Sequence, residues 1–241
     1  MEKLYLKNLV AAGVLGVALI ISTIYASQTF YQVKSLDNAL SVTGSAKQQI
    51  TSDSVKWISS FTRTVAIDQL KGGYDQMRSD QALVTKFYKD NGFAESDLLI
   101  SPVTLEQPFK YDANAPKQYQ LTQTVQLQST DLKKVTELAK NTKSLIDAGV
   151  IFANQSLEYY YSKLPELRIS MLSQAIADAK TRAEKLAESS GKKVGTLKSA
   201  SMGVVQVTPV NSVDVADYGS YDTSTIDKEV MVTVKALFTL K

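Results

Sequence analysis

The stretch PELRISMLSQAIADAKTRAEKLAESSG, residues 165–191, decides the fold around it. Pro165 suits the first turn of a helix, where its missing N–H loses no partner. Glu166 follows where the helix dipole favours negative charge. The interior is rich in Ala, Leu, Glu, Lys and Arg, which favour helix. Gly191 can take the left-handed conformation that ends a helix. The sequence therefore predicts one long helix over 165–191.

One face of this helix is apolar at helical spacing. Its members are Leu172, Ala175, Ile176, Ala179, Ala183, Leu186 and Ala187. The alanines recur every four residues, and such a ridge of small side chains lets a helix lie close against a sheet or another helix. Asp178 and Arg182, four residues apart on the outer side, form a pair worth roughly a few tenths of a kcal/mol. We expect a helix that covers the core.

The composition excludes several classes of site. The chain of 241 residues has neither Cys nor His, which removes Cys–His nucleophiles, the usual Ser-His-Asp triad and ordinary zinc sites. Any metal would need carboxylate and carbonyl ligands alone. The net charge of +3 is modest and no run of Lys or Arg forms a stripe, so we expect no nucleic-acid partner. We expect no cofactor either, and the lack of Cys suits an exported protein.

The N-terminal segment is predicted to enter a membrane. Residues 1–8, a predicted cytoplasmic tip, carry Lys3 and Lys7, and the run from Leu9 to Ala26, LVAAGVLGVALIISTIYA, is apolar. As a helix this run spans ~27 Å, close to a hydrocarbon core of ~30 Å. The lysines place the N-terminus in the cytoplasm.

Two interpretations fit this segment. A signal peptide has an apolar region of ~7–15 residues and a small-residue cleavage site; Ala26 offers one, but Ile24 makes the match poor. The length favours an uncleaved signal anchor at 9–26, which makes a single-pass protein of the cytoplasmic membrane. In both cases the rest lies in the periplasm or outside the cell. A stalk is predicted over 27–38, reaching up to ~40 Å if extended at ~3.3 Å per residue, and one domain over 39–241.

Strands and helices alternate in small groups along this domain. Alternating polarity predicts strands near 40–44, 55–65, 98–106, 119–128, 154–161, 194–207 and 230–238. Helical spacing predicts helices over 68–91, 131–148 and 165–191. A turn-rich loop is expected at 107–117. The order ββα, ββα, βα, ββ predicts an α+β fold: a two-layer sandwich with helices on one face of a largely antiparallel sheet.

Five tyrosines are the candidate interface residues. Tyr159, Tyr160 and Tyr161 are consecutive in a predicted strand, so at least one must face away from the core. Aromatic residues are enriched at protein interfaces, although a strand whose hydroxyls simply reach water fits equally well. Tyr218 and Tyr221 lie in a loop over 208–226 that is longer than ordinary connections. We expect that loop to contact a partner or to act as a mobile flap.

The same loop region is acidic, with Asp214, Asp217, Asp222 and Asp227. Their spacing does not fit an EF-hand, so no metal site is predicted. No paired carboxylates and no nucleophile motif stand out elsewhere. We therefore expect a protein that is not an enzyme and has no catalytic residues.

Several features together resemble the SIMPL-domain family, the YggE-like extracytoplasmic proteins. The Ala-rich pattern A-x-x-D-A-K-x-x-A-E-x-L-A spans 175–187, and Gly191 and Gly195 follow it. An opening strand ending at Gly44, a following Asp53, a strand that begins at Tyr119 and a closing V-x-V-x-V-x-A-x-F strand over 230–238 also fit. The resemblance covers 39–241. One departure is that Ser45 and Ala46 replace the usual second glycine after Gly44.

This resemblance implies an exported α+β protein that assembles into ring-like or channel-like homo-oligomers. Members are loosely associated with oxidative-stress defence and surface antigenicity. The leading hypothesis is a non-enzymatic assembly module, anchored through Leu9 to Ala26, whose partner is itself; other envelope proteins stay open as partners. The alternative is an extracytoplasmic binding module for a small molecule, glycan or envelope component that uses the 208–226 loop.

Overall fold

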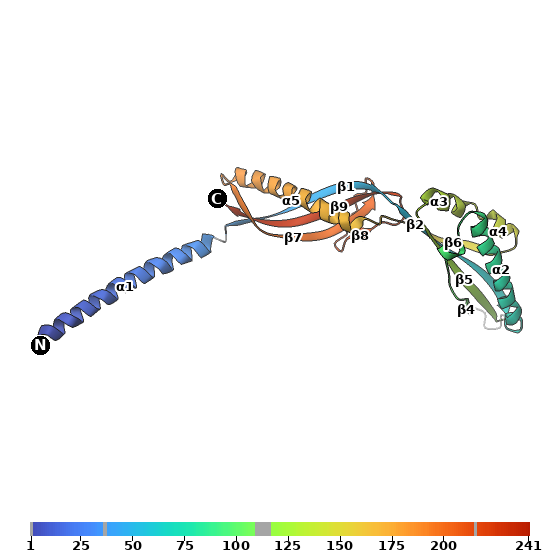
Figure 1. Cartoon of the computed structure of the whole chain (residues 1–241), viewed down its shortest axis with the longest axis horizontal. Coiled ribbons are helices and arrows are strands. Elements are labelled where there is room, and N and C mark those ends of the chain that lie inside the picture. The colour runs from blue at the N-terminus through green and yellow to red at the C-terminus, as the bar shows by residue number, and fades with distance from the viewer. Residues whose placement is uncertain (1, 36–37, 109–116, 215) are drawn as a thin grey trace. The chain divides into compact units, whose positions relative to one another are not determined.

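The computed structural model describes residues 2–35, 38–108, 117–214 and 216–241 (Figure 1). The predicted α+β class is confirmed, because helices pack on mostly antiparallel sheets. There are two sheets instead of the expected one. One has four strands in the order β1-β9-β7-β8, and the other has β3-β5-β2-β6 with β4 beside β5. The chain divides into two compact units, Met1–Ala46 with Arg168–Val204 and Val232–Lys241, and Lys47–Leu167 with Val205–Met231.

The elements have the following bounds. The α-helices are α1 (Glu2–Ser35), α2 (Leu70–Asp90), α3 (Leu132–Lys140), α4 (Lys143–Asp147) and α5 (Leu164–Ser189), with short 3-10 turns η1 (Ile67–Gln69) and η2 (Glu95–Asp97). The strands are β1 (Ala39–Thr51), β2 (Ser54–Ala66), β3 (Leu98–Ile100), β4 (Thr104–Glu106), β5 (Gln118–Ser129), β6 (Ile151–Tyr160), β7 (Val194–Pro209), β8 (Ser220–Tyr221) and β9 (Asp227–Leu240).

Two predicted elements are divided. The strand expected over 98–106 is interrupted around Pro102, which has no N–H for a ladder, and becomes β3 and β4. The helix expected over 131–148 breaks near Asn141 into α3 and α4. The loop predicted at 107–117 falls largely on 109–116, outside the described residues.

The N-terminal apolar segment lies in α1. Residues Gly13–Lys34 are long and apolar enough to cross a membrane, and none of that window is buried within the protein. The segment is consistent with a signal anchor or a signal peptide. The side chains of residues 2–12, with the two lysines of the predicted tip, are outside the described part. Because α1 continues to Ser35, the described part of the predicted stalk through Ser35 is helical and rises ~1.5 Å per residue, less than an extended chain.

The five-stranded sheet carries the larger core. Its central strand β2 pairs antiparallel with β5 and β6, and α2 and α3 contribute buried side chains to the same core. Trp57 is fully buried, with its ring 5.2 Å from that of Tyr88 and its Nε1 donating to Asn154 Oδ1 at 3.0 Å. Arg63 donates to both carboxylate oxygens of Asp80 at 2.6 and 2.8 Å. The two contacts tie β2 to its neighbouring strand and helix.

The predicted alanine ridge of α5 lies on β1 and β9. Ala175, Ala179 and Ala183 are fully buried, and a Cβ at Gly44 of β1 would come within 2.7 Å of the Ala179 Cα. Only glycine therefore fits where β1 crosses the helix (Figure 1). The small core there also contains Val42, Ala236 and Phe238. Leu186, which periodicity placed on the apolar face, is 53% exposed, so that part of the prediction was wrong.

The two long edges of the four-stranded sheet, along β1 and along the part of β7 that β8 does not cover, differ. In β1, the Ser45 N–H donates to Asp178 Oδ2 at 2.7 Å, and Arg182 Nε lies 2.9 Å from the same oxygen. Asp178 of α5 thus accepts a hydrogen bond from a backbone N–H of β1 that is not bonded to β9. In β7, by contrast, every residue from 196 to 204 is exposed. Strand β8 joins β7 only at Gln206 and Val207, and no other strand of the described chain borders this edge.

Candidate functional site

The five candidate tyrosines fall in different settings. Tyr159 is buried, and its hydroxyl lies 2.8 Å from Thr136 Oγ1. Tyr160, Tyr161 and Tyr221 are half-buried, and Tyr218 is 98% exposed. The expectation that at least one of the three consecutive tyrosines faces away from the core therefore agrees with the structure. Their role at an interface stays a prediction.

Three of these tyrosines meet at the end of β6. The rings of Tyr160 and Tyr221 stack with their centroids 6.0 Å apart, and the Tyr161 N–H donates to the Tyr221 hydroxyl at 2.9 Å. The Tyr160 hydroxyl donates to Glu158 Oε2 at 2.6 Å. This hydrogen bond to the carboxylate raises the pKa of Tyr160 to about 12 and lowers the pKa of Glu158. The Tyr160 phenol is therefore protonated at neutral pH, and the contacts of the cluster serve packing.

The second half of the 208–226 loop is fastened. The Tyr159 N–H donates to Thr223 O at 2.7 Å, the Asp222 N–H to Val207 O at 2.8 Å, and the Ser52 N–H to Ile226 O at 2.9 Å. Between Asn211 (φ 66°) and Gly219 (φ 84°) the described residues form an outward tip. At this tip Val213 is 91% exposed. The expected flap is therefore confined to the tip, because the second half of the loop is bonded to β6, β7 and the end of β1.

A buried ion pair closes the same loop. The Lys228 side chain is 0% exposed, and its Nζ lies 3.2 Å from Asp222 Oδ2 and donates to Thr225 O. Burial alone raises the pKa of Asp222, but hydrogen bonds from Ser224, Thr225 and Lys228 outweigh it and lower this pKa well below its usual range. For Lys228 burial is the largest effect, and it lowers the pKa because it disfavours the charged ammonium. The sequence analysis did not predict this pair. Lys228 lies two residues before the buried Val230, so alternation places both side chains on the same face of β9.

The loop carboxylates do not form a metal centre. Asp222 is saturated by the contacts just described, Asp227 accepts from Thr51 Oγ1 at 2.8 Å, and Asp214 accepts from Ser212 Oγ at 3.3 Å. Across the described part of the chain, no three Asp or Glu side chains converge in a way that could hold an ion.

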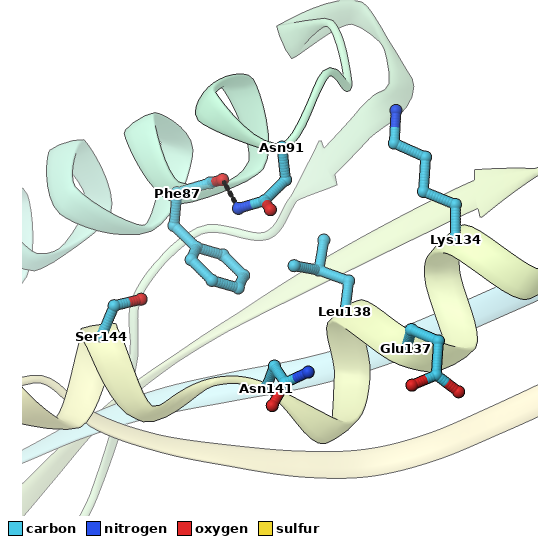
Figure 2. Close-up of a pocket in the computed structure, with 7 residues that line it drawn as sticks. All are labelled: Phe87, Asn91, Lys134, Glu137, Leu138, Asn141 and Ser144. Atoms are coloured by element: carbon cyan, nitrogen blue, oxygen red, sulfur yellow. Dashed lines mark hydrogen bonds between the residues drawn. The ribbon is translucent and has the colours of Figure 1, made fainter.

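A hollow of about 370 Å³ lies between α2, α3 and α4. Figure 2 shows the Phe87 ring and the Leu138 side chain facing each other, with Asn141 and Ser144 nearby. Its lining is completed by Asn91, Lys134 and Glu137. Two of these polar groups already serve backbone carbonyls: Asn91 Nδ2 donates to Phe87 O at 2.8 Å, and Lys134 Nζ to Gly92 O at 3.2 Å. The hollow presents no nucleophile beside a base, and it depends on the helix break near Asn141 that periodicity did not predict.

Comparison with known proteins supplies one match. The family model described as "SIMPL: Protein of unknown function (DUF541)" matches residues 40–238. A search of curated proteins finds no match. The resemblance drawn from the alanine ridge and the closing strand is thereby confirmed.

Proposed function

We propose, from the premise that this chain belongs to the SIMPL family of unknown function, that it is a non-enzymatic assembly module held outside the cytoplasmic membrane. Its partner is itself, and the product is a ring-like homo-oligomer that contributes to envelope or oxidative-stress defence. No residue is assigned to catalysis.

One observation carries the proposal: among the described residues of a single chain, no strand borders the edge of β7 from 196 to 204. The nine residues, TLKSASMGV, contain one charge, Lys198, and no proline. Natural proteins normally blunt such edges with several charges, prolines or a covering segment, because an exposed edge is a template for another strand. An edge left in this state is expected in a protein that pairs with a further strand in its working form.

The apolar helix supports the location. The segment Gly13–Lys34 is unburied, and 22 helical residues span ~33 Å at ~1.5 Å each, enough for a hydrocarbon core of ~30 Å. Copies anchored in one membrane meet at a raised effective concentration, which favours assembly.

The mass of the full chain tests the assembly. The chain, extracted in mild detergent, is examined by sedimentation with detergent density matching over a range of protein concentrations, followed by negative-stain imaging. We expect discrete particles at multiples of 26.4 kDa that become more abundant with concentration. A protein that stays at 26.4 kDa throughout contradicts the proposal.

Cysteine labelling tests the location. The chain has no Cys, so Lys192→Cys at an exposed position gives one reactive thiol. A membrane-impermeant maleimide is expected to label it in spheroplasts without lysis. Labelling only after lysis places the domain in the cytoplasm and contradicts the proposal.

The second candidate is a binding module, favoured by the exposed tip. Val213 and Tyr218 project an apolar and an aromatic side chain from the loop tip, in which Gln206 Nε2 donates to Ala216 O at 2.6 Å. Binding to glycan arrays or lipid vesicles that is lost in Tyr218→Ala, with unchanged particle mass, supports this candidate. Binding that is absent in the parent chain removes it.

A further inference from the structure

We propose that the occupant of the open β7 edge is the same edge of a second copy of this chain, paired antiparallel about a twofold axis at Ala200. The inference rests on the proposed assembly function and names its contact.

The backbone groups on this edge can be identified from the pairing with β8. The Val207 carbonyl accepts the Asp222 N–H at 2.8 Å on the β8 side. On the β9 side, the Thr196 N–H donates to Thr239 Oγ1 at 2.9 Å and the Val204 carbonyl accepts from Thr233 Oγ1 at 3.3 Å. Lys193 also pairs with Lys241 on that side, so the alternation is interrupted before Thr196. From Thr196 to Val207, backbone groups of even-numbered residues face β9 and those of odd-numbered residues face the other edge. The N–H and C=O groups of Leu197, Ser199, Ser201 and Gly203 therefore face outward, where no strand of the described chain reaches them.

Pairing about Ala200 is chemically self-complementary. In this arrangement the residue numbers of any two facing residues sum to 400. Ser199 therefore faces Ser201 of the second copy, and the two residues exchange both backbone hydrogen bonds. Lys198, the one charge in the run, faces the exposed Met202, so no like charges lie opposite each other. Leu197, 44% exposed, faces Gly203, which has no side chain to obstruct it.

The other edge of the sheet argues for a twofold contact. Pairing of β7 with β1 of a second copy would have to displace Asp178 from the Ser45 N–H and disturb its ion pair with Arg182. The β7 edge has no such obstacle. A surface that pairs with itself is isologous and closes after two copies. The contact therefore makes pairs, and joining pairs into a ring requires a second contact elsewhere.

The area of the contact is small. Nine residues at ~3.3 Å each give a strip ~30 Å long, and with a sheet ~10 Å thick this is on the order of 300 Å² per copy. Stable interfaces bury about 800 Å² per partner. The pair should therefore be weak between dilute chains and should form when copies share a membrane, which raises their effective concentration.

A single cysteine tests the pairing in the full chain in its native membrane. Residues facing each other at a non-hydrogen-bonded position have Cα atoms ~4.5 Å apart, within the ~4.4–6.8 Å span of a disulfide. We expect Ala200→Cys, in a chain otherwise free of cysteine, to give a reducible covalent dimer under mild oxidation. Thr43→Cys, exposed on β1 at the opposite edge of the same sheet, is the matched control and should stay monomeric. Equal cross-linking of both variants overturns the inference.

A second variant separates contact from chance collision. Ser199→Lys with Ser201→Lys, made in the Ala200→Cys chain, puts lysines opposite each other across the axis while altering only exposed side chains. The cross-linked fraction should fall about tenfold, with unchanged near-UV circular dichroism. An undiminished fraction overturns the pairing. If the parent chain is oligomeric but Ala200→Cys does not cross-link, this contact is wrong and the assembly proposal stands; if the parent chain is monomeric in membranes, both fail.

Discussion

Removing one partner of the buried Lys228–Asp222 pair should destabilise the protein strongly. Asp222→Ala leaves the fully buried Lys228 ammonium without a counter-charge, and removing one partner of such a pair costs roughly 3–5 kcal/mol. Asp222 also accepts bonds from the exposed Ser224 and the half-buried Thr225, and their loss adds to this cost. We therefore expect a loss of about 3–5 kcal/mol in the free energy of unfolding.

A double-mutant cycle identifies the cause. Lys228→Met removes the buried charge itself, so the Asp222→Ala, Lys228→Met chain should recover most of the loss, since replacing both members of a buried pair by apolar groups is often neutral or stabilising. Asp227→Ala is the matched control in the same segment. It is exposed and should change stability by no more than about 0.5 kcal/mol.

Urea unfolding followed by far-UV circular dichroism measures all five chains: the parent, Asp222→Ala, Lys228→Met, the double variant and Asp227→Ala. Their m-values are compared to check that all unfold in the same kind of transition. The reasoning is refuted if Asp222→Ala costs less than about 1 kcal/mol, a value typical of an exposed pair. It is also refuted if the double variant is no more stable than Asp222→Ala alone, because the buried charge would then not be the source of the loss.

Three further predictions concern single groups. Gly44→Ala should cost at least about 1–3 kcal/mol, since its Cβ meets the α5 backbone; a smaller loss in urea unfolding contradicts the close crossing. The pKa of Asp222 is lower in the folded than in the unfolded chain, so its contribution to stability is present above pH ~4 and declines as the pH falls below that value; Asp222→Asn should flatten the dependence of Tm on pH there. The hydrogen bond to Glu158 raises the pKa of Tyr160 to about 12, so Tyr160→Phe should remove a phenol that ionises at high pH from an ultraviolet titration. Loss of a phenol that ionises near its ordinary pKa would contradict the hydrogen bond to Glu158.

Features of the fold that depend on residues close together in the sequence could be predicted from it. The helix at 165–191 has its propensity, first turn and terminating glycine in one stretch, and Gly191 has the expected left-handed φ of 71°. The buried faces of β2 and β5 follow from alternation alone, as Trp57 and Leu121 show. Such patterns show which side of a helix or strand is buried, but not which element packs or pairs with it. The division of the strands into two sheets therefore could not be derived from them.

The candidate site was less predictable because its contacts are distant in sequence. The 208–226 loop looked mobile from its length, yet Thr223 is bound by Tyr159, far earlier in the chain. Tyr160 and Tyr221 were proposed together only as aromatic residues, and their stacking depends on β8, a two-residue strand. A strand this short has no period to detect.

The asymmetry of the sheet edges illustrates the same limit and yields a last prediction. As sequences β1 and the exposed run of β7 are alike, with few charges, but β1 is protected by a residue 133 positions away, Asp178. Its pairing with Arg182 was predicted as an ordinary surface pair, whereas its second bond, to the Ser45 N–H, protects an edge.

Asp178→Ala should free that donor and leave both edges of the sheet open. Two different open edges pair head to tail, and such contacts continue unless the rotation closes them. Sedimentation should then show particles larger than those of the parent chain, and Lys180→Ala, on the same helix but without a bond to β1, should not. If Asp178→Ala leaves the particle size unchanged, the carboxylate does not control which edge is used.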